Sequence, residues 1–145
     1  MAPADWKLIG SCLCGGVRYA VRGPLRNVGN CHCLVCRKAH GAAYGTFAVV
    51  DATSFRWTEG ETLLKQFGTG DQPRAFCGRC GTTLTGSAPR GRVALALATL
   101  DVDPLTRPAL HAHADSRAPW LELRDDLPRI AGGWKEANGP SEAES

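Results

Sequence analysis

The stretch CHCLVC, residues Cys31–Cys36, places three of the chain's seven cysteines within six positions. The other four form two pairs far away in the sequence, Cys12 and Cys14 in SCLC, and Cys77 and Cys80 in FCGRC. Seven is an odd number for disulfide bonds, and it does not divide into metal sites of four ligands each. The grouping of these cysteines therefore decides both the fold and the chemistry that the chain can support.

Length and composition are typical of one globular domain. The chain has 145 residues, of which 43% are hydrophobic and 21% charged, enough for a single domain with its own core. We expect this domain over residues 1–136 and a disordered acidic tail over residues 137–145, ANGPSEAES. The longest apolar run, Val93–Leu100, has the length of a strand, so no membrane span is expected. Asp5 lies where a signal peptide would carry its apolar segment, which predicts a cytoplasmic location with reduced cysteines.

Charge is unevenly distributed along the chain. The formal net charge is +3, but the first fifty residues hold six basic side chains and one acidic side chain, whereas residues 101–145 hold nine acidic and five basic ones. The basic residues are scattered rather than clustered, so we expect no nucleic-acid partner. Because CHCLVC lies in the basic part, a small anionic ligand near the cysteines is one use of this charge. A solvated surface without ligand preference is the other.

Strand patterns dominate the chain. GVRYAVRG, residues 16–23, alternates apolar and other side chains with the period of a half-buried strand, and GTFAVVD and RVALALATL are predicted as short apolar strands. Only LVCRKAHG, which follows Cys33, is predicted as a helix, of about two turns and ended by Gly41. LDVDPLTRP contains two prolines and is predicted as a loop. The predicted fold class is mostly β, with short helical turns.

Two of the cysteine groups together can close one metal site. Side chains two positions apart in a strand point to the same face, so Cys12 and Cys14 can bind one ion. Cys77 and Cys80 are presented by a tight turn, and the two pairs supply the four thiolates of a structural zinc site. Cys31, Cys33 and Cys36 then remain as three ligands. Three protein ligands leave one coordination position open, as catalytic zinc sites do.

Other partitions of the cysteines remain open at this point. The pairs Cys33–Cys36 and Cys77–Cys80 have the spacing of a zinc ribbon, which would leave Cys12, Cys14 and Cys31 over. Alternatively, Cys77 and Cys80 form a redox dithiol, although the strand-then-helix pattern of a thioredoxin-like motif is missing around them.

Three thiolate ligands also indicate a type of reactivity. Thiolates donate much electron density, so zinc bound by Cys31, Cys33 and Cys36 is a weaker Lewis acid than zinc bound by three histidines. Water activation is then less natural than the binding and exchange of a thiol. A small-molecule thiol such as glutathione fits this position, and its negative charge suits the basic half of the chain.

The histidines and the aspartate pair indicate no particular function. His32 lies between two of the predicted ligands, and an extended segment would point its side chain away from the metal. For His40, His111 and His113 we favour a surface or hydrogen-bonded core role over a ligand role. The pair Asp125–Asp126 is interpreted as capping or solvating a loop before Pro128.

Four stretches resemble, in order, the glutathione-dependent formaldehyde-activating enzyme family, which also includes centromere protein V. They lie between about Gly10 and Pro128 and read GSCLCGGVRYAVRGP, CHCLVCRKAHG, RAFCGRCGTTL and HAHADSRAPWLELRDDLP. The resemblance implies a single zinc-stabilised β-tent domain with two zinc ions per chain. It also implies a structural ion on Cys12, Cys14, Cys77 and Cys80, and a more labile ion at the catalytic site on Cys31, Cys33 and Cys36.

The resemblance further implies an activity. The named reaction of the family is that of a carbon–sulfur lyase, which interconverts S-(hydroxymethyl)glutathione with glutathione and formaldehyde. We therefore expect a zinc-dependent lyase acting on a thiol–aldehyde adduct, with a small-molecule thiol such as glutathione and an aldehyde as its partners. The alternative is a non-catalytic zinc-scaffolded binding module or a thiol carrier.

Overall fold

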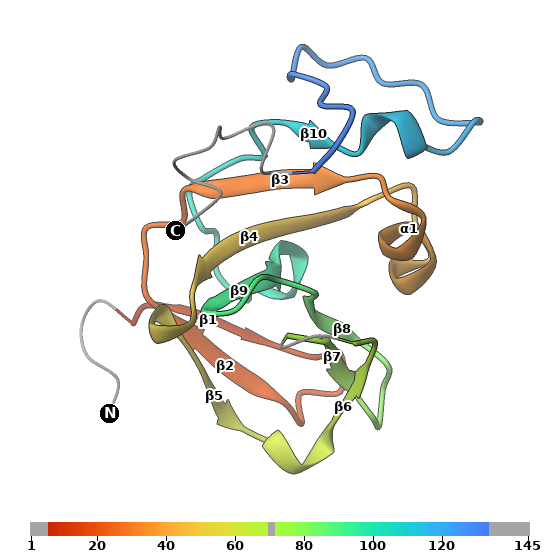
Figure 1. The fold of residues 1–145 in the computed structure, drawn as a ribbon. Helices are drawn as coiled ribbons and strands as arrows, with labels where there is room; N and C mark the ends of the chain where they lie inside the picture. Colours follow the sequence, from red (N-terminus) through yellow and green to blue (C-terminus); the bar gives the residue numbers. More distant parts are fainter. Residues whose placement is uncertain (1–5, 70–71, 134–145) are drawn as a thin grey trace. The chain divides into compact units, whose positions relative to one another are not determined.

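Over the residues that the structure describes, the protein is mostly β structure with one short α-helix, which confirms the predicted fold class. A computed structural model describes residues 6–69 and 72–133 (Figure 1). The predicted tail, residues 137–145, lies outside the described residues. The strands are β1 Leu8–Ser11, β2 Arg18–Val21, β3 Asn27–Cys31, β4 Gly45–Asp51, β5 Phe55–Glu59, β6 Leu64–Phe67, β7 Arg74–Cys77, β8 Thr83–Gly86, β9 Arg92–Ala96 and β10 His111–Ala112. The helix is α1 Leu34–His40, and short 3-10 turns cover Ala52–Ser54, Glu61–Leu63, Leu97–Thr99 and Ala114–Ser116.

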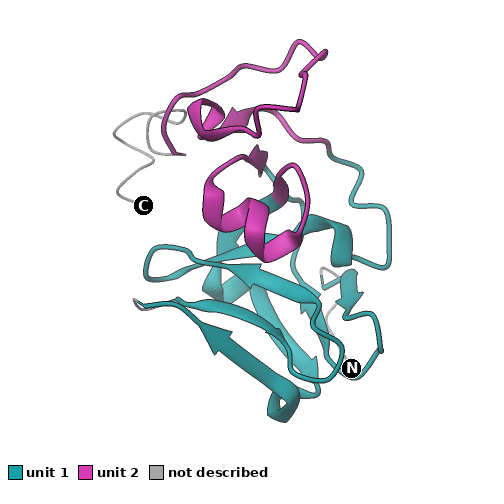
Figure 2. Ribbon diagram, turned by 90° about the vertical axis from the view of Figure 1, so that its right-hand side faces the viewer, with its two compact units in different colours: residues 1–27, 47–106 teal, residues 28–46, 107–145 magenta. Residues whose placement is uncertain are grey.

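The chain divides into two compact units, drawn in different colours in Figure 2. The first unit comprises residues 1–27 and 47–106, and the second comprises residues 28–46 and 107–145. Cys12, Cys14, Cys77 and Cys80 all belong to the first unit, whereas CHCLVC belongs to the second. Each group of cysteines therefore lies within one unit.

The first unit is built from antiparallel strands. One sheet has the order β1-β2-β5, and a second series of strands pairs in the order β4-β9-β8-β7-β6. The alternation predicted for residues 16–23 is present only in part: Val17, Tyr19 and Val21 are fully buried and Arg18 is exposed, but Ala20 is buried as well. The strand predicted over RVALALATL is shorter than expected. It ends at Ala96, where the chain enters a 3-10 turn.

Tyr19 is the centre of the core in this unit. Its ring stacks on Phe55 with 5.2 Å between the ring centroids, and Trp57 packs edge-on against it at 6.2 Å. Its hydroxyl lies 2.6 Å from the hydroxyl of Thr99. A side chain at Gly10 would overlap the Tyr19 ring, so β1 can approach β2 here only because this residue is glycine. This packing fixes the end of β1, which leads directly into Cys12.

The second unit contains α1 and the parallel pair of β3 and β10. His111 pairs with Asn30, and Ala112 pairs with Cys31. The helix begins after Cys33, whose sulfur accepts a hydrogen bond from the backbone N–H of Cys36 at 3.3 Å. It ends at Gly41, which has the left-handed conformation (φ 58°), as the sequence predicts. Strand β3 and helix α1 thus place the cysteines of CHCLVC around a short, well-defined bend.

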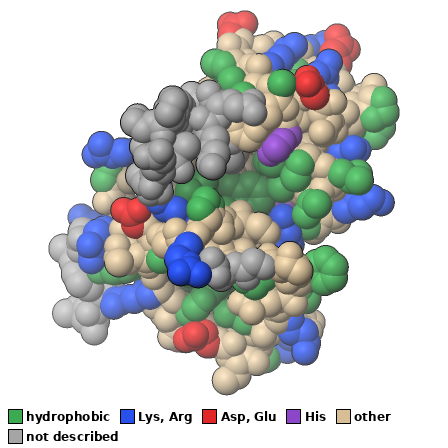
Figure 3. All heavy atoms as spheres, in the orientation of Figure 1, with side chains coloured by type: hydrophobic (Ala, Val, Ile, Leu, Met, Phe, Trp, Pro, Cys, Tyr) green, Lys and Arg blue, Asp and Glu red, His purple; other side chains and the backbone are tan. Residues whose placement is uncertain are grey.

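The surface carries charge of both signs. On the face shown in Figure 3, Lys and Arg side chains are spread out, and acidic side chains lie among them. Within residues 6–69 and 72–133, no helix is both long and apolar enough to cross a bilayer.

A close backbone approach next to the first pair of cysteines gives a test of this fold. Gly60 has a φ of +77°, and a Cβ there would overlap the carbonyl oxygen of Gly16, two residues after Cys14. We expect Gly60→Ala to lower the free energy of unfolding by about 3 kcal/mol or more, because a strained φ costs about 1–2 kcal/mol and the overlap forces the backbone apart. Denaturant unfolding measures this loss.

Gly91→Ala is the matched control. Gly91 has a φ of +82°, but a Cβ at this position has no atom within 4 Å. It should therefore lose only the conformational part, about 1–2 kcal/mol. Equal losses in the two variants would show that the contact between Gly60 and Gly16 does not support the structure.

Candidate metal sites

Two tight turns present the first group of cysteines. Cys12 directly follows β1, and its carbonyl oxygen accepts a hydrogen bond from the N–H of Gly15 at 2.9 Å. Cys77 ends β7, and its carbonyl oxygen accepts a hydrogen bond from the N–H of Gly81 at 2.8 Å. The two turns are also joined, since the N–H of Leu13 donates to the hydroxyl of Thr82 at 2.9 Å. These turns bring Cys14 and Cys80, the second cysteine of each pair, close to each other.

The sulfur atoms of Cys12, Cys14, Cys77 and Cys80 all lie within 4.8 Å of one another. The Cys12 and Cys14 sulfurs are 3.5 Å apart, and the Cys14 and Cys77 sulfurs are 3.9 Å apart. A tetrahedral zinc ion with bonds of about 2.3 Å to sulfur requires edges of about 3.8 Å. The spacing of this four-cysteine cluster therefore fits a metal ion bound by four thiolates.

Hydrogen-bond donors surround the four sulfurs. Backbone N–H groups donate to Cys12 from Val17 at 3.3 Å and to Cys77 from Arg79 at 3.4 Å. The side chain of Arg79 also donates through Nε to the Cys14 sulfur at 3.3 Å, and the Thr82 hydroxyl lies 3.3 Å from the Cys80 sulfur. Donors of this kind stabilise thiolates rather than thiols.

The pKa values reflect this environment. Hydrogen bonds from the side chain and then the backbone of Thr82 lower the pKa of Cys80 to about 5. The pKa of Cys14 is lowered by a backbone hydrogen bond from Gly16 and by Arg79. Burial raises the pKa of Cys12. Four thiolates at these distances repel one another, so a cation between them is what would allow all four to ionise together.

The second group lies at the bend between β3 and α1. The sulfurs of Cys31, Cys33 and Cys36 lie within 4.8 Å of one another. Cys31 and Cys36 are buried, while Cys33 is partly exposed. This three-cysteine cluster could also hold a metal ion. Its partial exposure at Cys33 leaves a side from which a small molecule can approach.

Hydrogen bonds within the three-cysteine cluster favour a thiolate at Cys33. Hydrogen bonds from Cys31 and then Cys36 are the main cause that lowers the pKa of Cys33, and His113 contributes a smaller electrostatic effect. Helix α1 has no acidic residue in its first turn and carries Arg37, Lys38 and His40 in its last turn. All seven cysteines fall within the described residues, and each is free of disulfide bonds.

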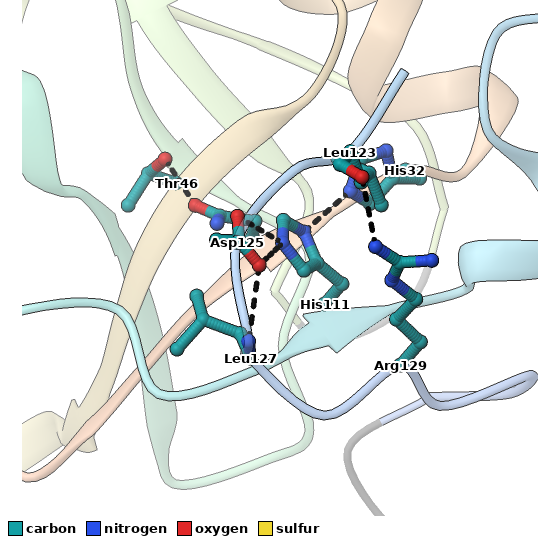
Figure 4. Close-up of polar contacts among 8 residues, drawn as sticks. His32, Thr46, His111, Leu123, Asp125, Leu127 and Arg129 are labelled. Atoms are coloured by element: carbon teal, nitrogen blue, oxygen red, sulfur yellow. Dashed lines mark hydrogen bonds and ion pairs between the residues drawn. The ribbon is translucent and has the colours of Figure 1, made fainter. Parts of the chain in front are cut away.

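A buried polar chain joins the three-cysteine segment to residues late in the sequence (Figure 4). His32 Nε2 lies 2.8 Å from His111 Nδ1, and His111 Nε2 lies 3.0 Å from Oδ2 of Asp125. Both histidine side chains are fully buried. The bond to His111 is the main cause that lowers the pKa of Asp125, while burial and then His111 lower that of His32 to about 4.

Comparison with known proteins identifies the family. The model of the family described as glutathione-dependent formaldehyde-activating enzyme matches residues 7–116. The chain belongs to this family. A crystal structure of a Rhodobacter sphaeroides protein is similar, with 25% sequence identity and a TM-score of 0.55, and the similarity covers 66% of this chain and 91% of that one. All seven cysteines lie inside the region matched by the glutathione-dependent formaldehyde-activating enzyme family.

The structure places the expected site residues in the groups that the sequence suggests. The four-cysteine and three-cysteine clusters have the composition expected from the four-plus-three partition. His111 is a hydrogen-bonded core histidine, and Asp125 accepts a hydrogen bond from the N–H of Leu127 in the loop before Pro128, as interpreted above. The sequence does not predict the contacts of His111 with His32 and Asp125. It also does not predict the hydrogen bond that Arg79 donates to Cys14. No local spacing rule in the sequence indicates these pairs.

The two clusters should respond differently to loss of one sulfur. Cys80→Ser removes a ligand from a cluster that joins distant parts of the first unit, so we expect the free energy of unfolding to fall by about 4 kcal/mol or more. Cys36→Ser affects a cluster confined to six residues, and we expect it to stay folded while binding less metal. Thermal unfolding and metal analysis of both variants measure these effects. Similar melting temperatures for the two variants would mean that both clusters have the same structural role.

Proposed function

We propose that this chain is a zinc-dependent carbon–sulfur lyase that acts on a thiol–aldehyde adduct such as S-(hydroxymethyl)glutathione. The observation that carries this proposal is the three-cysteine cluster, which offers three thiolates and is partly exposed at Cys33. Membership of the glutathione-dependent formaldehyde-activating enzyme family supports the same chemistry. A reducing location such as the cytoplasm would keep the thiols available.

The donor atoms fit zinc at both clusters. Thiolate sulfur is a preferred zinc ligand, and each cluster brings its sulfurs within 4.8 Å of one another. Cys12, Cys14, Cys77 and Cys80 would hold a structural ion, and Cys31, Cys33 and Cys36 would hold the ion at the catalytic site. When bound by three thiolates, zinc supplies an open coordination position and lowers the pKa of a thiol that enters it.

The residues of the second unit would attract and orient the substrate. Glutathione carries a net negative charge, and the last turn of α1 presents Arg37, Lys38 and His40. The burial of Cys31 and Cys36 shields two of the three sulfurs from water, so that exchange takes place at the side of Cys33. The bend between β3 and α1 holds this arrangement through the hydrogen bond from the Cys36 N–H to the Cys33 sulfur.

The proposed reaction is balanced without a redox partner. In the direction of cleavage, the hydroxymethyl oxygen loses its proton to water, its carbon–oxygen bond becomes the double bond of the aldehyde, and the carbon–sulfur bond breaks. The sulfur leaves with the electron pair as a thiolate. In the opposite direction, the thiolate adds to the aldehyde carbon and the oxygen takes up a proton.

Cobalt substitution tests thiol binding directly. In the cobalt-loaded protein, we expect the thiolate-to-cobalt absorption bands of the three-cysteine cluster to shift when glutathione is added. The shift should be absent in Cys36→Ser, while the bands of the four-cysteine cluster persist, and it should weaken as salt screens the basic side chains. Turnover is measured as exchange between formaldehyde and its glutathione adduct faster than the uncatalysed rate.

Two lysines provide a matched control for the charge effect. Lys38 is exposed on α1 and Lys65 is exposed on β6 in the first unit. Lys38→Gln should weaken glutathione binding about two- to fivefold, a typical effect of one exposed charge, and Lys65→Gln should not. A spectral shift without faster exchange would make the protein a thiol carrier. No shift with any of a panel of cellular thiols would contradict the proposed mechanism.

A further inference from the structure

One buried nitrogen next to the three-cysteine cluster lacks a partner. Nδ1 of His32 is fully buried and has no hydrogen bond to any of the described residues. Leaving a buried polar atom unsatisfied costs about 1–3 kcal/mol, so such atoms normally bind water or a ligand. His32 is the residue between Cys31 and Cys33, and consecutive Cα atoms are only about 3.8 Å apart. The unsatisfied atom therefore belongs to the segment that carries the three-cysteine cluster.

The contacts of His32 fix what kind of partner its Nδ1 needs. The Asp125 carboxylate can only accept hydrogen bonds, so His111 must donate to it through Nε2–H. With one proton on each ring, His111 Nδ1 is then an acceptor, and His32 must donate to it through Nε2–H. This leaves His32 Nδ1 without a proton. The free nitrogen is an acceptor and requires a donor.

A buried hydrogen-bond donor in the same unit also lacks a partner among the described residues. Nε of Arg37 is also buried and makes no hydrogen bond with the described residues. An Nε–H group can only donate, whereas His32 Nδ1 accepts. A hydroxyl group is a small partner that can donate to His32 Nδ1, and its oxygen can also accept from a donor such as an arginine N–H.

We propose that His32 Nδ1, in the segment that carries the three-cysteine cluster, is a preorganised acceptor for a hydroxyl group, with His111 and Asp125 as positioning residues that fix the tautomer of His32. The hydroxyl belongs either to an ordered water molecule or to the hydroxymethyl group of the adduct. The second source rests on the proposed function. The acceptor itself rests only on the buried contacts of the histidine pair.

Nitrogen-15 NMR of the zinc-loaded, full-length chain tests the tautomer without any substrate. We expect the proton of His32 on Nε2 and none on Nδ1. Asp125→Asn introduces an amide that can donate to His111 Nε2 and thus reverse the chain of donors, so part of His32 should change tautomer. Asp126→Asn, at the exposed neighbouring position, is the matched control and should change nothing. A proton on His32 Nδ1 in the wild type, or an unchanged His32 in Asp125→Asn, would overturn the proposal.

The same spectra distinguish the two sources of the hydroxyl. If the adduct supplies it, the His32 Nδ1 resonance moves when glutathione and formaldehyde are added together, but not with S-methylglutathione, which lacks the hydroxyl. If water supplies it, the resonance shows a hydrogen bond both with and without these compounds, together with a cross-peak to water. An Nδ1 that accepts no hydrogen bond under any of these conditions would contradict both sources.

A binding measurement complements the spectra if the adduct is the donor. His32→Gln retains a polar group that reaches toward His111 but offers no acceptor at the position of Nδ1. Its preference for the adduct over S-methylglutathione should fall about tenfold or more. If the wild-type zinc protein binds no adduct, the proposed function fails, whereas the tautomer measured by NMR still decides whether His32 is the acceptor.

Discussion

The first unit depends on the convergence of four sulfur atoms from two turns that are distant in the sequence. Cys14 and Cys77 are 63 residues apart, yet their sulfurs lie 3.9 Å from each other. Closing a loop of that length costs conformational entropy, and placing four ionisable thiols together adds repulsion once they become thiolates. A metal ion would compensate for both, because it would bind only when all four ligands are in place. The hydrogen bonds from Val17, Arg79 and Thr82 favour the thiolate forms that such an ion would need.

The three-cysteine cluster obeys a different constraint. Its ligands lie within six residues, so the bend between β3 and α1 brings them together with little loop entropy. A metal ion here has less effect on folding, and an open coordination position costs the protein little. His32 lies between two of these cysteines in the sequence, and its contact with His111 ties the segment to β10. In the proposed function, a site that exchanges ligands and a site that closes the fold would use the same residue type with opposite sequence spacing.

How far the sequence predicts the structure depends on the range of the interactions involved. Helix α1 and its end at Gly41 could be predicted because cap and helix residues are neighbours, and β2 because alternating side chains report burial directly. Zinc-ligand spacing allows the observed grouping of the cysteines but also a zinc ribbon, and the family resemblance favours the four-plus-three partition. Strands such as β6, with three of its four residues exposed, carry no such pattern and are held by pairing with β7. The polar chain could not be predicted, since His32 and His111 are 79 residues apart.

Metal analysis during mild chelation shows whether one cluster closes the fold while the other keeps an open coordination position. We expect two zinc ions per purified chain. A mild chelator should remove one of them while circular dichroism and the melting temperature stay close to those of the untreated protein, and the second should leave only when the protein unfolds. A single ion per chain, or two ions lost together with the fold, would contradict the account.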